Sequence, residues 1–444
     1  MLLTIEKLIY GGDGLGRLPA DEHGRGKAVF VPLVLAGEEI EASLTEQKPG
    51  FARAEALAII TPSPHRVSPV CPYFGQCGGC HYQHTSYEQQ LEIKKEILRE
   101  TVRRTAKTEL PCEIQVHPSP PWSYRNRTRL QLHAQPGFAA GYFKPGSHEL
   151  LAVEECPISS PLINRAIAML WQSGRAGKVP EGVLEIEFFS TADDSQLLAE
   201  LSCSSEVRRP AVRAWAEELR ATMPEIAGVV AFRQARPGTC SQQEKLLSLG
   251  ATLLTYQTQR AAYRVSAGSF FQTNRHLTDE LVRIVTAGMS GELALDLYAG
   301  VGLFSTALAC DFHHIVSVES SQLSSGDLAY NLPSNGQAVQ ATTEQYLARA
   351  ENPGRAGKGT VLSHTFHTPD LAVVDPPRSG LGERVARQLA NLRAPRLTYV
   401  ACDPATLARD LVPLLAAGYR MEQVHLVDLF PQTFHLESVV HLVR

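Results

Sequence analysis

The sequence predicts an α/β fold: an open, mostly parallel sheet with helices on both faces, preceded by a small β-barrel and a central α+β region. Two observations lead to this prediction. From about residue 262 onward, apolar runs such as "LALDLYAG", "HIVSVE", "LAVVDPPRSG" and "LTYVACDP" alternate with helical patterns. Before residue 58, short alternating runs such as "LTIEKLIY" and "EEIEASL" are separated by glycine-rich turns, a pattern typical of a small barrel.

The chain has 444 residues, more than one ordinary domain holds, and three domains are expected. Residues 1–58 are assigned to the barrel, 59–258 to the central region and 259–444 to the open sheet. Within the last of these, "RAENPGRAGKGT" at 349–360 is expected to be an exposed loop.

The central region begins with a stiff, proline-rich linker, "TPSPHRVSP", followed by a cysteine-rich segment. A helix near 87–105 is predicted next, because Ile93, Ile97 and Leu98 fall on one face of it. Packing of this helix on the C-terminal domain is the alternative to packing within the central region. From residue 119 to about 258 the apolar runs are short and strand-like, which indicates a mixed α+β region.

Composition excludes several classes of protein. With 44% hydrophobic and 20% charged residues and a net charge of −4, the sequence indicates a globular protein without a global attraction for nucleic acid. The N-terminus lacks the pattern of a signal peptide, and no apolar run approaches the roughly 20 residues of a membrane span. We therefore expect a cytoplasmic protein, in which the nine cysteines stay reduced and serve metal binding or catalysis rather than disulfides.

Four polar residues end successive apolar strands of the predicted open sheet: Asp296, Glu319, Asp375 and Cys402. In such sheets ligands bind beyond the carboxyl ends of the strands, so we expect all four to line one rim. The two prolines that follow Asp375 stiffen its loop, and its carboxylate is suited to hydrogen-bond an amine or a base edge.

A glycine turn, Gly300-x-Gly302, lies between a strand and a helix. A dinucleotide-binding fingerprint requires a third glycine where Ser305 stands, which weakens a pyrophosphate site. Glu319 ends the next strand, where a carboxylate can accept hydrogen bonds from both ribose hydroxyls. A ribose-containing cofactor without a pyrophosphate suggests S-adenosylmethionine; a plain strand-to-helix turn is the alternative.

Cys402 precedes a predicted helix, with Asp403 suited to the N-cap and Pro404 to the first helical position. The positive end of the helix dipole favours a thiolate there, although the charge of Asp403 opposes it. An inert buried cysteine is the alternative. Glu437 lies in "QTFHLESVVHL", where strand alternation alone predicts a solvated residue rather than a catalytic base.

Four motifs occur in an order that identifies a family: "LDLYAGVGLFS", "VVDPPRSG", "ACDPATLARDL" and "FPQTFHLESV". Together with "SFFQTN" at 269–274, they closely resemble the RNA 5-methyluridine (uracil-C5) methyltransferases, of the TRAM-domain and iron–sulfur-containing 23S rRNA type. The resemblance runs nearly end to end. It implies a Rossmann-like S-adenosylmethionine methyltransferase domain, an OB-like N-terminal TRAM barrel that binds RNA, and a central iron–sulfur domain.

The resemblance also assigns roles to residues. It makes Cys402 the nucleophile that attacks carbon 6 of uracil, Glu437 the base that removes the carbon 5 proton, and Asp375 a polar contact to uracil and cofactor. One of Phe270 and Phe271 is expected to contact the base or cofactor. The residues that fall where the family holds the cofactor are Gln272, Tyr298, Gly300, Gly302 and Glu319.

The chain departs from the family pattern at three places. An acidic residue usually contacts adenine where this chain has Thr342 and Thr343, with Glu344 the nearest acid. Leu303 replaces an asparagine found in some relatives, and Asp403 replaces an asparagine found in many. The residue that contacts adenine is therefore left open among Thr342, Thr343 and Glu344.

Cys71, Cys77 and Cys80 supply three thiolates from one segment, and a fourth ligand must come from elsewhere. Spacing does not choose between zinc and an iron–sulfur cluster. The resemblance implies a [4Fe–4S] cluster with Cys156 as the fourth ligand, and Cys112 is the rival. A role in folding or RNA positioning is expected, since methyl transfer moves no net electrons.

Arg125, Arg127 and Arg129 alternate in "YRNRTRLQLH", which places all three on one face of a strand and suits an RNA backbone. The sequence therefore predicts a monomeric RNA uracil-C5 methyltransferase acting on 23S ribosomal RNA. The same reaction on the T-loop uridine of tRNA, a non-catalytic RNA-binding assembly factor and a cluster-based redox enzyme are the rivals; retention of both Cys402 and Glu437 argues against a non-catalytic factor.

Overall fold

The computed structural model describes residues 1–19, 26–111, 113–134, 137–234, 244–351 and 368–444. Most of the expected loop at 349–360 lies outside the described residues, as does Cys112.

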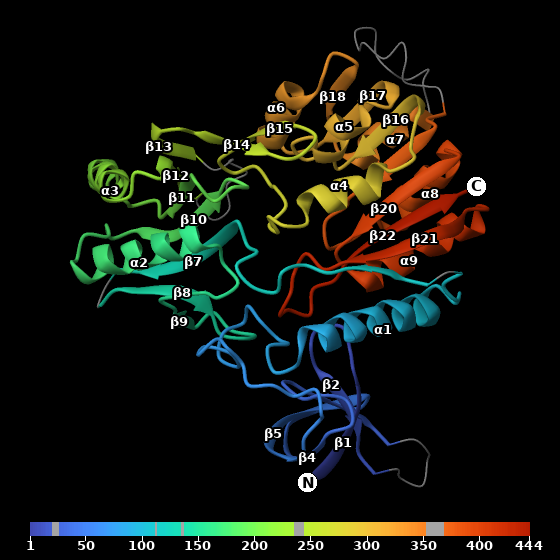
Figure 1. Cartoon of the computed structure of the whole chain (residues 1–444), viewed down its shortest axis with the longest axis horizontal. Coiled ribbons are helices and arrows are strands. Elements are labelled where there is room, and N and C mark those ends of the chain that lie inside the picture. The colour runs from blue at the N-terminus through green and yellow to red at the C-terminus, as the bar shows by residue number, and fades with distance from the viewer. Residues whose placement is uncertain (20–25, 112, 135–136, 235–243, 352–367) are drawn as a thin grey trace.

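The N-terminal strands close into a five-stranded barrel with the order β1-β2-β3-β5-β4 (Figure 1). Alternate residues of β1, such as Leu3 and Ile5, point into a core of small aliphatic side chains. This confirms the barrel that the alternating runs predict. Its strands are β1 (Leu2–Leu8), β2 (Gly14–Arg17), β3 (Ala28–Val31), β4 (Glu39–Gln47) and β5 (Phe51–Thr61).

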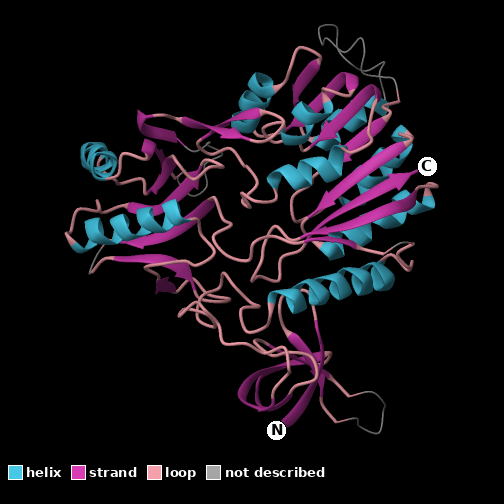
Figure 2. Ribbon diagram, in the orientation of Figure 1, coloured by secondary structure: helices cyan, strands magenta, loops and turns pink. Residues whose placement is uncertain are grey.

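Helix α1 (Tyr87–Thr105) matches the helix predicted from the pattern. It begins at Ser86, whose hydroxyl accepts a hydrogen bond from the backbone N–H of Gln89. Its apolar residues are buried on two sides: Ile93 and Ile97 pack against the barrel, and Leu98 joins the core of the C-terminal sheet. Figure 2 shows α1 lying between these two parts of the molecule.

Lys94 on α1 makes a buried ion pair with the loop after β21 (Arg420–Val427). Its ammonium lies 2.6 Å from Asp428 Oδ1 and also donates to the carbonyl of Phe430 at 2.9 Å, and neither charged side chain is exposed. A buried charge is tolerated only with such partners. The pair therefore anchors α1 to the C-terminal sheet.

Replacing Lys94 with methionine is expected to destabilise the protein by about 3–5 kcal/mol, because Asp428 is left as an unpaired buried charge. Urea unfolding measures the change. Arg99→Met, which removes an exposed pair with Glu96 on the same helix, is the matched control and should cost less than about 1 kcal/mol. Equal losses in the two variants would contradict the role of the buried pair.

The central part contains a seven-stranded sheet with the order β13-β12-β11-β10-β7-β8-β9. Helices α2 (Pro161–Arg175) and α3 (Arg209–Thr222) share one core with one face of this sheet. The other face contributes to the core of the C-terminal sheet. The strands are β7 (Arg127–His133), β8 (Ala139–Phe143), β9 (Leu150–Ala152), β10 (Val183–Ser190), β11 (Leu197–Cys203), β12 (Ile226–Arg233) and β13 (Glu244–Gly250).

The C-terminal sheet has eight strands in the order β18-β17-β16-β19-β20-β22-β21-β6, and only β22 runs against the others. Helices α1, α7, α8 and α9 pack on one face and α4 and α5 on the other, as expected for an open sheet with both faces covered. The remaining strands are β6 (Gln115–His117), β16 (Gly291–Leu297), β17 (Phe312–Glu319), β18 (Gly336–Gln340), β19 (Leu371–Val374), β20 (Arg396–Ala401) and β22 (Glu437–Val443). The helices are α4 (Thr278–Thr286), α5 (Leu303–Leu308), α6 (Gln322–Asn331), α7 (Thr343–Glu351), α8 (Gly382–Leu392) and α9 (Pro404–Ala416).

Two features cross the boundary expected at residue 258. Strand β6 comes from the central region of the sequence, yet it pairs with β21 at the edge of the C-terminal sheet. The hairpin of β14 (Leu253–Gln257) and β15 (Ala262–Ser266) spans the boundary itself. The central and C-terminal parts therefore exchange segments across the expected boundary, and they also share a hydrophobic core.

Candidate active site

A cavity of about 680 Å³ opens at the carboxyl ends of the parallel strands. Glu319, Asp375 and Cys402 line it from the ends of β17, β19 and β20. Glu437 lines it from the start of β22, which runs in the opposite direction and so begins at this rim. Three of the four strand-end residues named from the sequence thus lie around one cavity, together with Glu437.

Asp296, the fourth strand-end residue, lies behind the cavity rather than on its rim. Its side chain is fully buried and accepts a hydrogen bond from the hydroxyl of Ser305 on α5. Burial raises the pKa of Asp296 to about 7, and the charge of Glu319 adds to the increase. The hydrogen bonds from Ser305 lower the pKa and offset part of this effect. The sequence prediction for this residue is wrong because α5 covers its side chain.

Asp296→Asn is expected to make stability less dependent on pH. In the folded protein the pKa of the Asp296 carboxyl lies above its usual value of about 3.9. Between about pH 4 and 7 this carboxyl therefore ionises only in the unfolded chain, and the free energy of unfolding falls as the pH rises. Between about pH 5 and 8, the wild type should lose on the order of 3 kcal/mol more than the variant in urea unfolding. The exposed Asp311 provides the control variant, Asp311→Asn; a wild type and Asp296→Asn with the same pH slope would contradict the prediction.

The cofactor end of the cavity is built on a turn with three left-handed residues, Tyr298, Gly300 and Gly302, whose φ angles are 63°, 56° and 93°. The Glu319 carboxylate accepts hydrogen bonds from the backbone N–H groups of Gly300 at 2.9 Å and Ser321 at 2.6 Å. These bonds hold one carboxylate beside the turn and orient it before any ligand binds.

Gly302 is not among the residues that line the cavity. It is the N-cap of α5, and a Cβ at this position would lie 2.9 Å from Leu328 Cδ1. Tyr298, Gly300 and Glu319 do line the cavity, and Gln272 faces them from the loop between β15 and α4. The turn therefore favours glycine at Gly302 because its φ of 93° lies in the left-handed region that side-chain-bearing residues rarely adopt.

Thr342, Thr343 and Glu344, the three candidates for a contact with adenine, line an adjoining cavity of about 310 Å³. The two cavities share Tyr298 as a wall residue. The Glu344 carboxylate pairs with Arg384 on α8.

Cys402 follows β20 directly, and α9 begins as predicted. Asp403 is the N-cap and accepts hydrogen bonds from the N–H groups of Ala405 and Thr406, both at 2.9 Å, and Pro404 is the first helical residue. Burial raises the pKa of the Cys402 thiol to about 12, and the charges of Glu437 and Asp375 add to this. The expected preference for a thiolate is therefore wrong for this structure, since loss of water and two carboxylates outweigh the helix dipole.

Glu437 is 4% exposed, which contradicts the solvated position predicted from alternation. Every residue of β22 is buried, because the strand lies between β20 and β21 and helices cover both faces of the sheet. Burial and the charge of Asp375 raise the pKa of Glu437 well above that of a free carboxyl. The pKa of Asp375 is raised in turn by burial and by Asp296.

The two adjacent phenylalanines, Phe270 and Phe271, lie in different environments. Phe270 lines the mouth of the cavity and is 61% exposed, whereas Phe271 is 2% exposed and packs 4.4 Å from the ring centroid of Tyr256. Phe270 is thus the one available to a ligand.

Arg378 and His435 also line the cavity, and neither was named from the sequence. Arg378 Nη2 lies 3.4 Å from His435 Nε2, and it lowers the pKa of the Cys402 thiol. Burial lowers the pKa of His435 to about 3, and the charge of Arg378 contributes. Their positions directly after "DPP" and two residues before Glu437 are the signals that could have found them.

Residues 86–444 match the family described as tRNA (Uracil-5-)-methyltransferase, and residues 1–57 match the TRAM domain. The chain belongs to the tRNA (uracil-5-)-methyltransferase family. It is therefore an RNA methyltransferase, which agrees with the S-adenosylmethionine expected from the sequence.

Two similar proteins of known sequence are RNA methyltransferases by name. An "uncharacterized RNA methyltransferase" of Aquifex aeolicus is 30% identical over 99% of this chain and 97% of its own. The "23S rRNA (uracil(1939)-C(5))-methyltransferase RlmD" of Chromohalobacter salexigens is 33% identical over 100% of this chain and 89% of its own.

A solved structure shares the fold along the whole chain. The Pyrococcus abyssi tRNA (uracil-54, C5)-methyltransferase in complex with S-adenosyl-L-homocysteine superimposes with a TM-score of 0.73, at 23% identity, over 100% of both chains.

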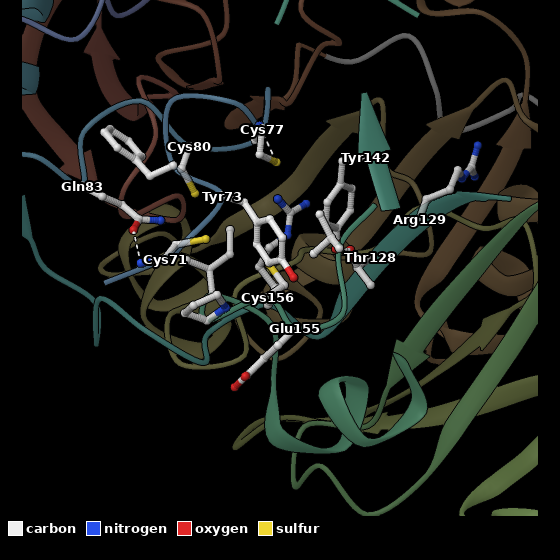
Figure 3. A pocket seen from close by; sticks show the side chains of 16 residues that line it. Cys71, Tyr73, Cys77, Cys80, Gln83, Thr128, Arg129, Tyr142, Glu155 and Cys156 are labelled. Atoms are coloured by element: carbon white, nitrogen blue, oxygen red, sulfur yellow. Dashed lines mark hydrogen bonds between the residues drawn. The ribbon is translucent and has the colours of Figure 1, made fainter. Parts of the chain in front are cut away.

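In this family member, four cysteines line a second cavity, of about 250 Å³. Cys71, Cys77 and Cys80 come from the loop before α1, and Cys156 comes from the loop after β9. Figure 3 shows the four sulfur-bearing side chains around the cavity, with the Glu155 carboxylate pointing away from it. The backbone N–H of Cys156 donates a hydrogen bond of 2.9 Å to Asn164 Oδ1, which positions this residue.

The four thiols surround a space and do not converge on a point. Across the described ranges, no group of three or more His, Cys, Asp or Glu side chains could hold a single metal ion. Burial raises the pKa of Cys77 to about 11 and of Cys80 to about 12.

The three alternating arginines do not form one free basic face. The Arg127 guanidinium is largely buried, stacks 4.2 Å over the ring of Phe189 and donates to the carbonyl of Ser269 at 2.7 Å. Arg129 is about half exposed and pairs with Glu187 at 3.0 Å, and both Arg125 and Arg129 line the cysteine cavity. The prediction of a phosphate-binding face does not hold for Arg127, because the core encloses its side chain.

None of the helices within the described part of this RNA methyltransferase has both the length and the apolar character that crossing a membrane requires.

Proposed function

We propose that this chain transfers a methyl group from S-adenosylmethionine to carbon 5 of a uridine in 23S ribosomal RNA, through a covalent adduct between Cys402 and carbon 6. The observation that carries the proposal is that Cys402, Glu437 and Asp375 line the same cavity as Gly300 and Glu319. A nucleophile, a base and a ribose-binding carboxylate are the groups this reaction requires.

The cofactor fits the end of the cavity formed by Glu319, Tyr298 and Gln272. Glu319 is already oriented by two backbone N–H groups and has the capacity to accept ribose hydroxyls. The adjoining cavity beyond Tyr298 suits the adenine, with Thr342 and Thr343 on its wall. When bound, S-adenosylmethionine supplies an electrophilic methyl group and a positive sulfonium charge, which favours the ionised forms of nearby carboxyls.

The protein's part of the reaction has three steps. The Cys402 thiol gives its proton to water in the cavity, and Sγ bonds to carbon 6 of uracil, which leaves an enolate with electron density at carbon 5. Carbon 5 then forms its bond to the methyl group as the bond between that group and the sulfonium sulfur breaks, which would leave S-adenosylhomocysteine. Glu437 removes the proton from carbon 5, the bond between Sγ and carbon 6 breaks, and the thiolate is released. Asp375 orients the uracil through its carboxyl.

A uridine stacked in folded RNA reaches Cys402 only after it has rotated out of its stack. Phe270 is placed to support such a base, since an exposed aromatic ring at the cavity mouth offers a stacking surface to a nucleobase. The TRAM barrel and Arg129 are assigned to binding of the surrounding RNA.

The relative from Chromohalobacter salexigens supports 23S ribosomal RNA as the substrate, at 33% identity over the full length of this chain. The second candidate is tRNA, which the family description and the Pyrococcus abyssi structure favour. Incubation with S-adenosylmethionine and each RNA prepared without the modification, followed by digestion and mass spectrometry for 5-methyluridine, separates the two. No 5-methyluridine in either RNA would overturn the proposal.

A [4Fe–4S] cluster fits the cysteine cavity, because each iron of such a cluster takes one thiolate and the four sulfurs therefore surround a volume. Cys71, Cys77, Cys80 and Cys156 would hold it. Anaerobic reconstitution with iron and sulfide should give about four irons per chain and a broad visible absorption. Cys156→Ala should lose both, whereas Cys310→Ala, at an exposed position, should lose neither.

A further inference from the structure

Tyr10 connects the N-terminal barrel with the active site. It lies in the turn between β1 and β2, and its hydroxyl donates a hydrogen bond of 3.2 Å to the backbone carbonyl of Cys402. Its ring meets the ring of Phe434 edge-on, with centroids 5.4 Å apart and planes at 89°. One barrel residue thus contacts the residue that carries the thiol and the segment that leads into Glu437.

The Tyr10 hydroxyl is suited to act as a donor. Burial raises its pKa far above the usual value, and the charges of Asp403 and Cys402 raise it further, so it keeps its proton at any pH at which the protein works. It also faces the carboxylate of Asp403, which caps α9. The donor therefore lies at the peptide where β20 ends and the helix begins.

Phe434 is held from several sides. His81 packs against it with ring centroids 4.6 Å apart, and His435 packs at 4.3 Å. Two residues earlier, the carbonyl of Gln432 accepts hydrogen bonds from the N–H groups of His81 at 2.8 Å and Tyr82 at 3.0 Å. The segment between β21 and β22 is thus positioned by parts of the chain that precede α1.

We propose that Tyr10 is a positioning residue for methyl transfer: its hydroxyl orients the Cys402 peptide and its ring supports Phe434, so that the barrel sets the thiol against the Glu437 carboxylate. This inference depends on the proposed function of Cys402. It gives the TRAM barrel a part in the chemical step, in addition to RNA binding. Small displacements of a nucleophile have large effects on rate, so a single contact of this kind is measurable.

The test uses the full-length protein and two variants. Tyr10→Phe removes only the hydroxyl, and Tyr10→Ala removes the ring as well. Tyr330→Phe, at a tyrosine that is 70% exposed on α6, is the matched control. The measurements are kcat, KM for RNA, the dissociation constant of the RNA complex, and the rate of covalent adduct formation with RNA that contains 5-fluorouridine.

For Tyr10→Phe we expect kcat and the adduct rate to fall about 3–10-fold, the effect of losing one hydrogen bond, with RNA affinity unchanged. For Tyr10→Ala the fall should be about 10–100-fold. If Tyr10→Ala does not fold, the conservative variant decides alone.

A Tyr10→Phe protein with wild-type kcat and adduct rate overturns the inference, and so does a loss confined to RNA affinity, which would make Tyr10 an RNA contact. Neither outcome affects the proposed function. A wild type that forms no adduct, or a Cys402→Ala protein that still forms one, overturns the proposed mechanism instead, and the inference falls with it.

Discussion

Replacing Cys402 with alanine is expected to lower kcat for methyl transfer by at least about 10⁴-fold, because the reaction loses the atom that bonds to carbon 6 of uracil. Without that bond, carbon 5 has too little electron density to attack the methyl group. Methyl transfer from radiolabelled S-adenosylmethionine to unmodified RNA measures the rate, and 5-fluorouridine RNA should form no stable complex with the variant.

Binding should survive this substitution. Cofactor and RNA affinities are expected to stay within about twofold of the wild type, since the thiol adds little to either contact. Cys310→Ala, at an exposed cysteine, is the control and should keep full activity. A Cys402→Ala protein that retains the covalent complex would place the nucleophile at another cysteine.

Glu437→Gln is expected to lower kcat by about 10²–10⁴-fold and to accumulate the covalent complex with normal RNA. Glutamine cannot accept the carbon 5 proton, so the adduct forms and takes the methyl group but is not resolved. The substitution also removes a carboxylate whose charge raises the pKa of the Cys402 thiol, so the first step should not slow.

Denaturing gels reveal the complex as a band that contains both protein and RNA. Glu422→Gln, on the neighbouring strand β21 and paired with Arg396, is the control and should turn over normally. If Glu437→Gln loses activity without accumulating the complex, then Glu437 acts before or during the attack of the thiol, and its assignment as the base is wrong.

The sequence was sufficient for features with local causes. The start of α9 follows from Asp403 and Pro404, whose preferences act within one turn of helix. The course of α1 follows from apolar spacing, and the strand-end positions of Glu319, Asp375 and Cys402 follow from the alternation of strands and helices. The roles of Cys402 and Glu437 came from resemblance in motif order rather than from spacing.

Other features depended on which segments cover which side chains. The alternation of apolar and polar residues wrongly predicted that Glu437 is exposed to solvent. The pattern along one strand does not reveal that β22 is covered on both faces. Asp296 lies next to the end of β16, close to where it was expected, but α5 encloses it. Arg127 has the charge of an RNA contact and the burial of a core residue.

Local sequence therefore determined the α/β class, the barrel, the helix starts and the row of polar strand ends, since each depends on residues a few positions apart. Only the tertiary structure decided the protonation of the thiol and the contact of Tyr10 with Cys402. Both depend on loss of water and on partners from distant parts of the chain: Glu437 and Asp375 shift the thiol pKa, and Tyr10 lies 392 residues from the carbonyl it holds. Such partners meet only after the barrel, α1 and the C-terminal sheet have packed together.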